Sequence, residues 1–284
     1  MKIQARGKIN WTLDVVGRRA DGYHLLDMLM QPIALHDTLS ILPADGLSLT
    51  VEGAPGLSVG GDNLILRAAR ALQKEFGVSS GARIALTKRI PMGAGLGGGS
   101  ADAAAALKGL NALWGLGADL AALCRIGEGL GADVPFCLHD APRRAQGIGE
   151  RLTPIESRAF PLVLVQPCAA LSTKEVFAAY HASPDIAPPD TEKTARALAE
   201  GDLSALRDCA GNVLEGASIP LRPQIAQAKN ALYAHGAAFS QMTGSGSVVF
   251  GAFDGREAAA RAYDALRQQY AVCILTETAL ESVR

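Results

Sequence analysis

The feature that most constrains this chain is a glycine-rich segment that opens directly into an alanine-rich stretch, Pro91–Asp102. Five of the seven residues from 93 to 99 are glycine, more than a tight turn requires. Without Cβ atoms, successive backbone N–H groups can crowd around one anion. A helix expected at residues 100–114 would add unpaired N–H groups and the positive end of its dipole. The segment therefore predicts a phosphate-binding loop that leads into a helix.

Three kinds of phosphate loop compete for this segment, beside a plain flexible linker. A P-loop requires a Lys before the Ser or Thr, but Gly99 precedes Ser100 directly. Residues 93–98 match the dinucleotide pattern Gly-x-Gly-x-x-Gly, yet Pro91 separates them from the preceding strand and Asp119 follows on a helix. Linkers of Gly and Ser seldom open onto an alanine-rich helix. The ATP loop of small-molecule kinases is the interpretation that we favour.

Composition narrows the functional class. The 284 residues are 49% hydrophobic and 19% charged, with a net charge of −1, which is typical of a globular chain with two domains. We see no basic face for nucleic acid, no signal peptide at the start, and no apolar run of about 18 residues for a membrane span. The five cysteines are scattered without a C-x-x-C pair, so we expect neither a disulfide framework nor a zinc site. A cytoplasmic protein is the expectation.

Strand-like patterns dominate the first third of the chain. Residues 8–16 alternate apolar and polar side chains, which predicts a strand. Residues 38–42 and 47–52 flank Asp45-Gly46, a hairpin signal, so we expect them to pair with each other. Other expected elements are helices at 64–76, 100–114 and 119–130, a strand at 82–87, and a turn at 131–136 that leads into a short strand.

The pattern changes near residues 153–161, where Pro154 and Pro161 bracket a polar stretch. We therefore expect one domain at 1–153 and a second at 154–284. The second domain contains expected strands at 162–165, 237–242, 247–253 and 271–276, and expected helices at 173–181, 191–200, 202–209, 221–234 and 255–270. Their order predicts an α+β layer in which helices cover one face of a small antiparallel sheet.

Besides the glycine loop, six further segments form recognisable motifs, and together they span nearly the whole chain. In order they are Gly7–His24, Gly131–Phe136, Gly147–Arg151, Pro167–Phe177, Asn212–Glu215 and Met242–Ser247. Together they resemble the 4-diphosphocytidyl-2-C-methyl-D-erythritol kinases, within the superfamily of galactokinase, homoserine kinase, mevalonate kinase and phosphomevalonate kinase. The chain departs from the family pattern at Gly7, Gln146 and Val213, where Ala, Arg and Asp are common.

The resemblance implies a fold and a reaction. The fold would be α+β with two domains, a ribosomal-protein-S5-like N-terminal domain and a ferredoxin-like C-terminal domain, with the active site between them. The reaction would be ATP-dependent phosphorylation of the 2-hydroxyl of 4-diphosphocytidyl-2-C-methyl-D-erythritol, a step of non-mevalonate isoprenoid precursor biosynthesis. The chain would be a monomer or a weak homodimer that binds this small-molecule substrate and no nucleic acid or membrane.

The resemblance also assigns roles to residues of the reaction centre. Asp133 would accept the proton of the substrate hydroxyl as general base. Lys8 would lie beside Asp133 and the γ-phosphate and stabilise the charge that develops there. From local sequence alone, Asp133 capping a turn and Lys8 lying solvated at a strand edge are the simpler interpretations. The residues that would bind ATP are Pro91, Met92, Gly93, Ala94, Gly95, Leu96, Gly97, Gly98, Gly99, Ser100 and Ala101.

Tyr23 and His24 would hold the cytosine of the substrate. An aromatic ring can stack on a base, and a His can hydrogen-bond to its edge. Asn10 and Asp14 lie on the same strand face as Lys8 and would support it or contact substrate. Mg²⁺ is implied because ATP is used as its magnesium complex. The sequence offers no carboxylate pair dedicated to the metal, and Ser100 is a candidate ligand by analogy.

Some alternatives stay open at this level. Another kinase of the superfamily, acting on homoserine or mevalonate, would not need the base-binding segment Asp21–His24. A catalytically silent RNA-binding module on the same fold is disfavoured by the net charge and by the presence of Lys8, Asp133 and the complete glycine loop. The Gly244–Ser247 segment could be a simple hairpin or a loop that packs beside the phosphate loop, and Thr173 could cap a helix.

Overall fold

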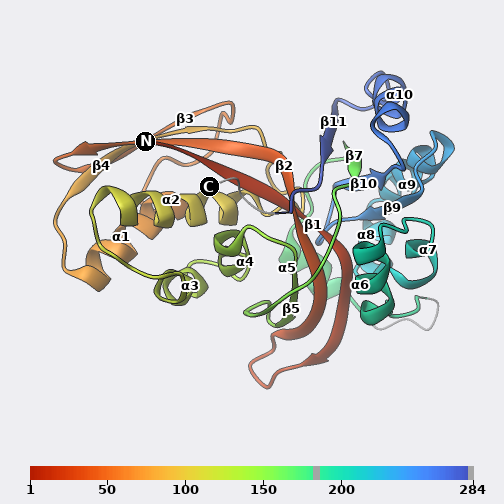
Figure 1. Cartoon of the computed structure of the whole chain (residues 1–284), viewed down its shortest axis with the longest axis horizontal. Helices are drawn as coiled ribbons and strands as arrows, with labels where there is room; N and C mark the ends of the chain where they lie inside the picture. The colour runs from red at the N-terminus through yellow and green to blue at the C-terminus, as the bar shows by residue number, and fades with distance from the viewer. Residues whose placement is uncertain (182–185, 281–284) are drawn as a thin grey trace. The chain divides into compact units, whose positions relative to one another are not determined.

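The structure is a computed structural model that describes residues 1–181 and 186–280 (Figure 1). By its internal contacts the chain divides into two compact units, each discontinuous in sequence. Unit 1 comprises Met1–Gly7, Leu35–Pro91 and Gly97–Asp140, and unit 2 comprises Lys8–Ala34, Met92–Leu96 and the described residues from Ala141 onward. The expected domain boundary after residue 153 falls inside strand β6 (Arg151–Pro154), within unit 2, and remains a prediction.

Unit 1 is a sheet covered by helices. Its strands are the first residues of β1 (Lys2–Arg18), the end of β2 (His24–Ala44), β3 (Leu47–Glu52) and β4 (Gly81–Thr87). β4 lies between its two neighbours, antiparallel to β2 with Ser40 opposite Ala85 and parallel to β3 with Leu49 opposite Ile84. The expected hairpin between 38–42 and 47–52 is therefore wrong. The chain does turn at Asp45-Gly46, but it opens enough to admit β4, whose Ala82 N–H donates to the Gly46 carbonyl.

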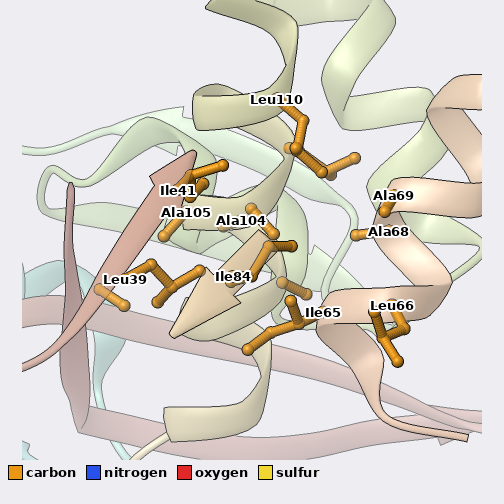
Figure 2. Packing of buried hydrophobic residues seen from close by; sticks show 14 of the residues in the cluster. Leu39, Ile41, Ile65, Leu66, Ala68, Ala69, Ile84, Ala104, Ala105 and Leu110 are labelled. Atoms are coloured by element: carbon orange, nitrogen blue, oxygen red, sulfur yellow. The ribbon is translucent and has the colours of Figure 1, made fainter. Parts of the chain in front are cut away.

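Helices α1 (Leu64–Phe76) and α2 (Gly98–Leu113) pack on this sheet, and both were expected nearly at these bounds. α1 begins where the Asn63 side chain accepts from the Ile65 N–H at 2.9 Å, and ends at Gly77, which has a left-handed φ of 64°. Figure 2 shows how their side chains meet those of β2 and β4 in one core: Leu39, Ile41, Ile65, Leu66, Ala68, Ala69, Ile84, Ala104, Ala105 and Leu110.

Two shorter helices complete unit 1. α3 (Leu120–Glu128) lies within the expected helix at 119–130, and the Asp119 side chain caps it by accepting from the Ala122 N–H. α4 (Val134–His139) stands where a turn and a short strand were expected, so that expectation is wrong. Pro135 misled the prediction, because proline is tolerated in the first turn of a helix, where its missing N–H costs no hydrogen bond.

In unit 2, the long strands β1 and β2 continue into a second region of sheet. The strand order there is β6-β5-β2-β1-β8, with β5 at Arg143–Gly147 and β8 at Gly211–Asn212. β1 therefore extends well beyond the expected residues 8–16, and β8, only two residues long and parallel to β1, has no sequence signal. Its pairing brings Asn212 opposite Leu13.

The C-terminal part of unit 2 is a four-stranded antiparallel sheet in the order β11-β7-β10-β9. Its strands are β7 (Pro161–Gln166), β9 (Phe239–Met242), β10 (Val249–Ala252) and β11 (Val272–Glu277). Helices α9 (Gln224–Ala234) and α10 (Arg256–Leu266) pack on it (Figure 1). This order, with helices after the first and third strands, is the ferredoxin-like arrangement. The α+β prediction is confirmed.

The remaining helices refine the expected bounds. They are α5 (Thr173–Ala179), α6 (Thr191–Glu200), α7 (Leu206–Cys209) and α8 (Glu215–Leu221). The expected helix at 202–209 is thus shortened to its last turn, and α8 was not expected. Among the described residues, we find no helix with the length and apolar content needed to cross a membrane.

Candidate active site

The glycine segment forms an irregular loop that passes from one unit to the other: Met92–Leu96 belong to unit 2, and the residues on both sides belong to unit 1. Gly93, Gly95 and Gly97 all have positive φ angles, of 61°, 78° and 69°. Gly97 is the N-cap of α2, and no side chain caps the first turn of that helix. The first N–H groups of α2 therefore have no acceptor within the helix, as an anion-binding helix start requires.

Lys8 is buried, with 4% of its surface exposed, although a lysine usually keeps its ammonium in water. Its Nζ donates to Asn10 Oδ1 at 2.8 Å and to the Gly95 carbonyl at 2.8 Å. Its backbone N–H donates to the Leu96 carbonyl. The strand-edge interpretation of Lys8 is therefore wrong: the ammonium is held against the glycine loop itself.

Asn10 links Lys8 to a second loop, the turn at Thr243–Ser247. Besides Lys8, the Asn10 Oδ1 accepts from the Gly244 N–H at 3.1 Å, and the Asn10 N–H donates to Thr243 Oγ1 at 3.1 Å. A Cβ on Gly95 would lie 2.1 Å from the Thr243 carbonyl oxygen, so only glycine fits there. The turn thus packs beside residues 93–96 of the phosphate loop, as the second of the two interpretations predicts.

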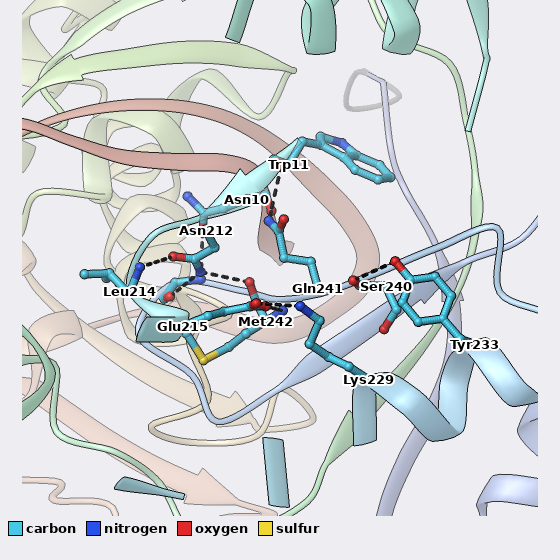
Figure 3. A network of polar contacts seen from close by, with 11 residues as sticks. Asn10, Trp11, Asn212, Leu214, Glu215, Lys229, Tyr233, Ser240, Gln241 and Met242 are labelled. Atoms are coloured by element: carbon cyan, nitrogen blue, oxygen red, sulfur yellow. Dashed lines mark hydrogen bonds and ion pairs between the residues drawn. The ribbon is translucent and has the colours of Figure 1, made fainter. Parts of the chain in front are cut away.

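Asn212 and Glu215 fix the backbone at the start of the same turn by hydrogen bonds (Figure 3). The Asn212 Nδ2 donates to the carbonyls of Met242 and Gly244, at 2.9 and 2.8 Å, and its Oδ1 accepts from the Leu214 N–H. Glu215 accepts from the Met242 N–H at 2.8 Å and pairs with Lys229. Thr173 is the first residue of α5 and not its N-cap, which is Ser172, and its hydroxyl is hydrogen-bonded to that of Ser245 at 2.9 Å.

In unit 1, the segment that contains Asp133 approaches the end of the phosphate loop. A Cβ on Gly131 would lie 3.7 Å from Ser100 Oγ in the first turn of α2. Asp133 is the N-cap of α4, but its side chain makes no capping hydrogen bond. The simpler interpretation, in which the Asp133 carboxylate acts as a cap, is therefore wrong. The Gly131 end of this segment therefore lies beside the first turn of α2.

His24 is the first residue of β2 in unit 2, and Tyr23 directly precedes it. Tyr23 is 63% exposed, whereas the His24 ring stacks on Phe177 with a centroid distance of 5.0 Å and meets the edge of Tyr180 at 6.1 Å. Burial lowers the pKa of His24, and the nearby charge of Arg18 lowers it further. Sequence reasoning missed Phe177 and Tyr180 because they are about 150 residues away from His24 in the chain.

Asp14 lies farther along β1, within electrostatic reach of Tyr180. Burial raises its pKa, a hydrogen bond from the Val15 N–H opposes that rise, and Asp27 adds to it. Burial, followed by the charge of Asp14, raises the pKa of the Tyr180 phenol. Asp27 itself is fixed by Arg144, which donates to both of its carboxylate oxygens at 2.8 and 2.6 Å. Asp14 therefore lies within electrostatic reach of the aromatic group around His24.

A buried charged group in unit 1 was also missed. Lys88 Nζ lies 2.5 Å from Asp37 Oδ2 and 2.7 Å from Asp102 Oδ2. All three side chains are at most 5% exposed. The pKa of Asp102 is raised to about 7. Burial is the main cause, the charge of Asp37 adds to the rise, and the charge of Lys88 opposes it. Nothing in the spacing of residues 37, 88 and 102 signals such a cluster.

The predicted residues thus form three groups. Lys8 and Asn10 meet the glycine loop at Gly95, the Asp133 segment meets the loop at Ser100, and Tyr23, His24 and Asp14 lie near Phe177 and Tyr180. The roles of these residues, including the pairing of Lys8 with Asp133, remain predictions. Among the described residues, no cluster of three His, Cys, Asp or Glu side chains could hold a metal ion.

Two family models match the chain. The family described as GHMP kinases N terminal domain matches residues 63–141, which include the glycine loop, α2 and Asp133. The family described as GHMP kinases C terminal matches residues 194–272, which include Asn212, Glu215 and the turn at Thr243–Ser247. Solved structures of a homoserine kinase from Cytophaga hutchinsonii and of the Methanococcus jannaschii mevalonate kinase share the fold, each with a TM-score of 0.71, at 19% and 12% identity.

Other relatives are much more similar. The 4-diphosphocytidyl-2-C-methyl-D-erythritol kinase of Pelotomaculum thermopropionicum is 47% identical over 254 residues, covering 87% of each chain. That of Acetivibrio thermocellus is 41% identical over 280 residues, covering 98% of this chain and 99% of its own. A crystal structure of 4-(cytidine 5'-diphospho)-2C-methyl-D-erythritol kinase matches with a TM-score of 0.84 at 36% identity, covering 98% of this chain and 99% of that one. The chain therefore belongs to the 4-diphosphocytidyl-2-C-methyl-D-erythritol kinase family of the GHMP kinases.

Proposed function

We propose that this kinase transfers the γ-phosphoryl group of ATP to the 2-hydroxyl of 4-diphosphocytidyl-2-C-methyl-D-erythritol. The observation that best supports the proposal is the buried Lys8 ammonium, which is bonded to the Gly95 carbonyl of the glycine loop and to Asn10. A buried cation fixed against an anion-binding loop suits a reaction in which negative charge moves between oxygen atoms. Such a transfer needs positioning and charge stabilisation more than covalent chemistry.

In this proposal the glycine loop and the first turn of α2 bind the phosphates of ATP. The N–H groups of residues 93–100 donate to phosphate oxygens, and the dipole of α2 favours the negative charge. Asp133 accepts the proton of the attacking hydroxyl, and Lys8 stabilises the charge on the transferred phosphoryl group. Asn10 holds the Lys8 ammonium in place through its Oδ1.

ATP would bring Mg²⁺ with it. Magnesium is usually bound by one or two protein oxygens together with substrate phosphates, and it does not require a dedicated cage of carboxylates. The Ser100 hydroxyl, in the first turn of α2 and close to Gly131, is the protein oxygen that fits this role. The ion would neutralise phosphate charge, while the residues named above position the reactants.

The cytidine part of the acceptor would bind at Tyr23 and His24. The exposed Tyr23 ring offers a face for the base, and His24 is oriented by its stacking on Phe177. Asp14 lies near the same aromatic group and would contact a polar part of the acceptor. We place the reaction in the cytoplasm, with the chain acting as a monomer or weak homodimer and without nucleic acid.

The test is ADP release with three acceptors under identical conditions: 4-diphosphocytidyl-2-C-methyl-D-erythritol, mevalonate and homoserine. We expect kcat/KM for the cytidine acceptor to exceed that for the other two by at least about 10³-fold, because a site built to bind a base loses those contacts with a small acid. A faster reaction with mevalonate or homoserine would reassign the substrate. Salt-dependent RNA binding without phosphoryl transfer would instead revive the binding-module hypothesis.

A further inference from the structure

The two ends of the glycine loop are joined by a buried ion pair. Lys88 immediately follows β4 and precedes the loop, and Asp102 lies just after it in α2. Their Nζ and Oδ2 atoms are 2.7 Å apart. The thirteen residues between them include all of the residues that we assign to ATP binding. The pair therefore sets the distance between the chain's entry to the phosphate loop and its exit.

Asp37 fixes the entry side of this arrangement. Its Oδ2 contacts Lys88 Nζ, and its Oδ1 accepts from the Arg89 N–H at 2.5 Å and from the Ile90 N–H at 2.8 Å. These backbone bonds orient the last residues before the loop. On the exit side the packing is equally close: a Cβ on Gly98 would lie 3.0 Å from both Lys88 Nζ and Ile90 Cγ2.

The charges themselves require an explanation beyond stability. Two carboxylates surround one ammonium, and within the described part of the chain the Asp102 Oδ1 has no hydrogen-bond partner. Buried ion pairs are often no more stabilising than apolar side chains of similar volume, whereas their directed hydrogen bonds can fix one geometry among several. A buried oxygen without a partner lowers stability, so stability alone does not account for the pair, and its directed bond to Lys88 is the feature to test.

We propose that the Lys88–Asp102 pair is a clamp that holds the phosphate loop and the first turn of α2 in the geometry that binds ATP, with Asp37 anchoring Lys88. Asp102 is then a positioning residue, because it acts through the backbone N–H groups and not by contact with ATP. The inference rests on the proposed ATP site and extends it to residues on both sides of the loop. A flexible loop would have to lose its freedom on binding ATP, and the clamp removes that cost in advance.

The test separates loop positioning from general stability. In Asp102→Ala, we expect KM for ATP to rise at least about tenfold, equivalent to about 1.4 kcal/mol of lost binding, with KM for the cytidine acceptor unchanged. Asp102→Asn keeps an oxygen that can accept from Lys88, so it should recover most of the ATP affinity. The matched control is Asp140→Ala, because Asp140 is a partly buried carboxylate of the same unit that pairs with Arg6 at 3.5 Å. It should lower Tm but leave KM for ATP unchanged.

An active wild type together with an unchanged KM for ATP in Asp102→Ala would overturn the clamp alone. If Asp102→Ala does not fold, the affinity of Asp102→Leu for a non-hydrolysable ATP analogue decides the question, because leucine fills the space but cannot accept from Lys88. A measurable loss supports the clamp, and affinity equal to that of wild type overturns it. A wild type that neither binds ATP nor phosphorylates any acceptor would refute the proposed function, and the clamp with it.

Discussion

At the scale of single residues, the chemistry depends on polar groups held where water cannot compete. Lys8 is 4% exposed and Asn10 is 1% exposed, and the hydrogen bond between them is 2.8 Å long. In such surroundings an electrostatic interaction is stronger than in water. Residue substitutions near the loop should therefore change turnover far more than substitutions of exposed residues of the same type.

The first prediction concerns Lys8 and Asp133. In Lys8→Ala and in Asp133→Ala, kcat should fall at least about 10²-fold, because each removes a group that acts on charge or protons in the transition state. Circular dichroism should show an intact fold. Lys2→Ala removes an exposed lysine from the same strand as Lys8 and should have no effect on kcat. Near-normal turnover in both active-site variants would contradict the assignment.

The second prediction concerns Tyr23. In Tyr23→Ala, KM for the cytidine acceptor should rise about tenfold, since stacking on a base contributes about 1–3 kcal/mol, whereas KM for ATP should not change. Tyr23→Phe keeps the ring and should stay close to wild type. Steady-state kinetics with each substrate varied in turn makes the comparison. An unchanged acceptor KM in Tyr23→Ala would show that the base binds elsewhere.

The third prediction is a pH dependence at His24. Burial and the charge of Arg18 both lower its pKa, so the neutral ring persists below the pH at which an ordinary histidine gains its proton. Because the neutral ring can both donate to and accept from a base edge, KM for the acceptor should stay constant above about pH 6.5 and rise only below it. Arg18→Gln removes one cause of the lowered pKa and should move this rise to higher pH. Identical pH profiles would exclude His24 as the titrating group.

At the scale of elements, the glycine loop depends on the neighbouring turn. Gly95 has a φ of 78°, and a Cβ there would meet the Thr243 carbonyl oxygen at 2.1 Å. We predict that Gly95→Ala loses most of its activity and lowers Tm by more than Gly115→Ala. Gly115 also has a positive φ, of 64°, but no atom lies near the position of an added Cβ. Gly115→Ala therefore measures the cost of backbone strain without a steric clash. Equal thermal shifts in the two variants would contradict this packing.

The position of the Thr243–Ser247 turn depends on hydrogen bonds from Asn212. Asn212→Ala removes two donors from the carbonyls of Met242 and Gly244, and a buried acceptor left unsatisfied costs about 1–3 kcal/mol. Because the Gly244 N–H also bonds to Asn10, we predict a fall in kcat as well as in stability. Asn111→Ala is the control: its amide bonds both the N–H and the carbonyl of Ala118, in unit 1, and its loss should reduce stability only. Urea unfolding and kcat, measured together, distinguish the two.

Sequence patterns predicted individual helices and strands better than they predicted which strands pair with one another. α1, with Asn63 and Gly77 at its ends, could be predicted because caps and periodicity are local signals. The pairing of β3 with β4 could not, since the hairpin signal at Asp45-Gly46 says nothing about a strand that arrives later and enters between its arms. The Lys88 cluster and the Asn212 hydrogen bonds join residues far apart in the chain, so no spacing reveals them. The motifs pointed to Lys8, but not to the contacts that bury it.

At the scale of the whole molecule, the residues to which we assign roles belong to both units. Asp133 and Ser100 belong to unit 1, whereas Lys8, His24 and the turn at Thr243–Ser247 belong to unit 2. β1, β2 and the glycine loop each pass from one unit to the other, so the sequence order of the motifs does not follow the division into units. The family is evident because relatives match along nearly the full length of the chain, with the 41% identical relative covering 98% of it.

We propose that this chain phosphorylates one particular hydroxyl of a cytidine-bearing acceptor. The most direct test is ³¹P NMR of the product formed from ATP and 4-diphosphocytidyl-2-C-methyl-D-erythritol. Carbon 2 carries the methyl group and no hydrogen, so a phosphate on its hydroxyl should appear as a new monoester signal without three-bond coupling to a proton. With Lys8→Ala the signal should grow at least about 10²-fold more slowly. A monoester signal split by carbinol protons, or no new signal while mevalonate or homoserine is phosphorylated, would contradict the account.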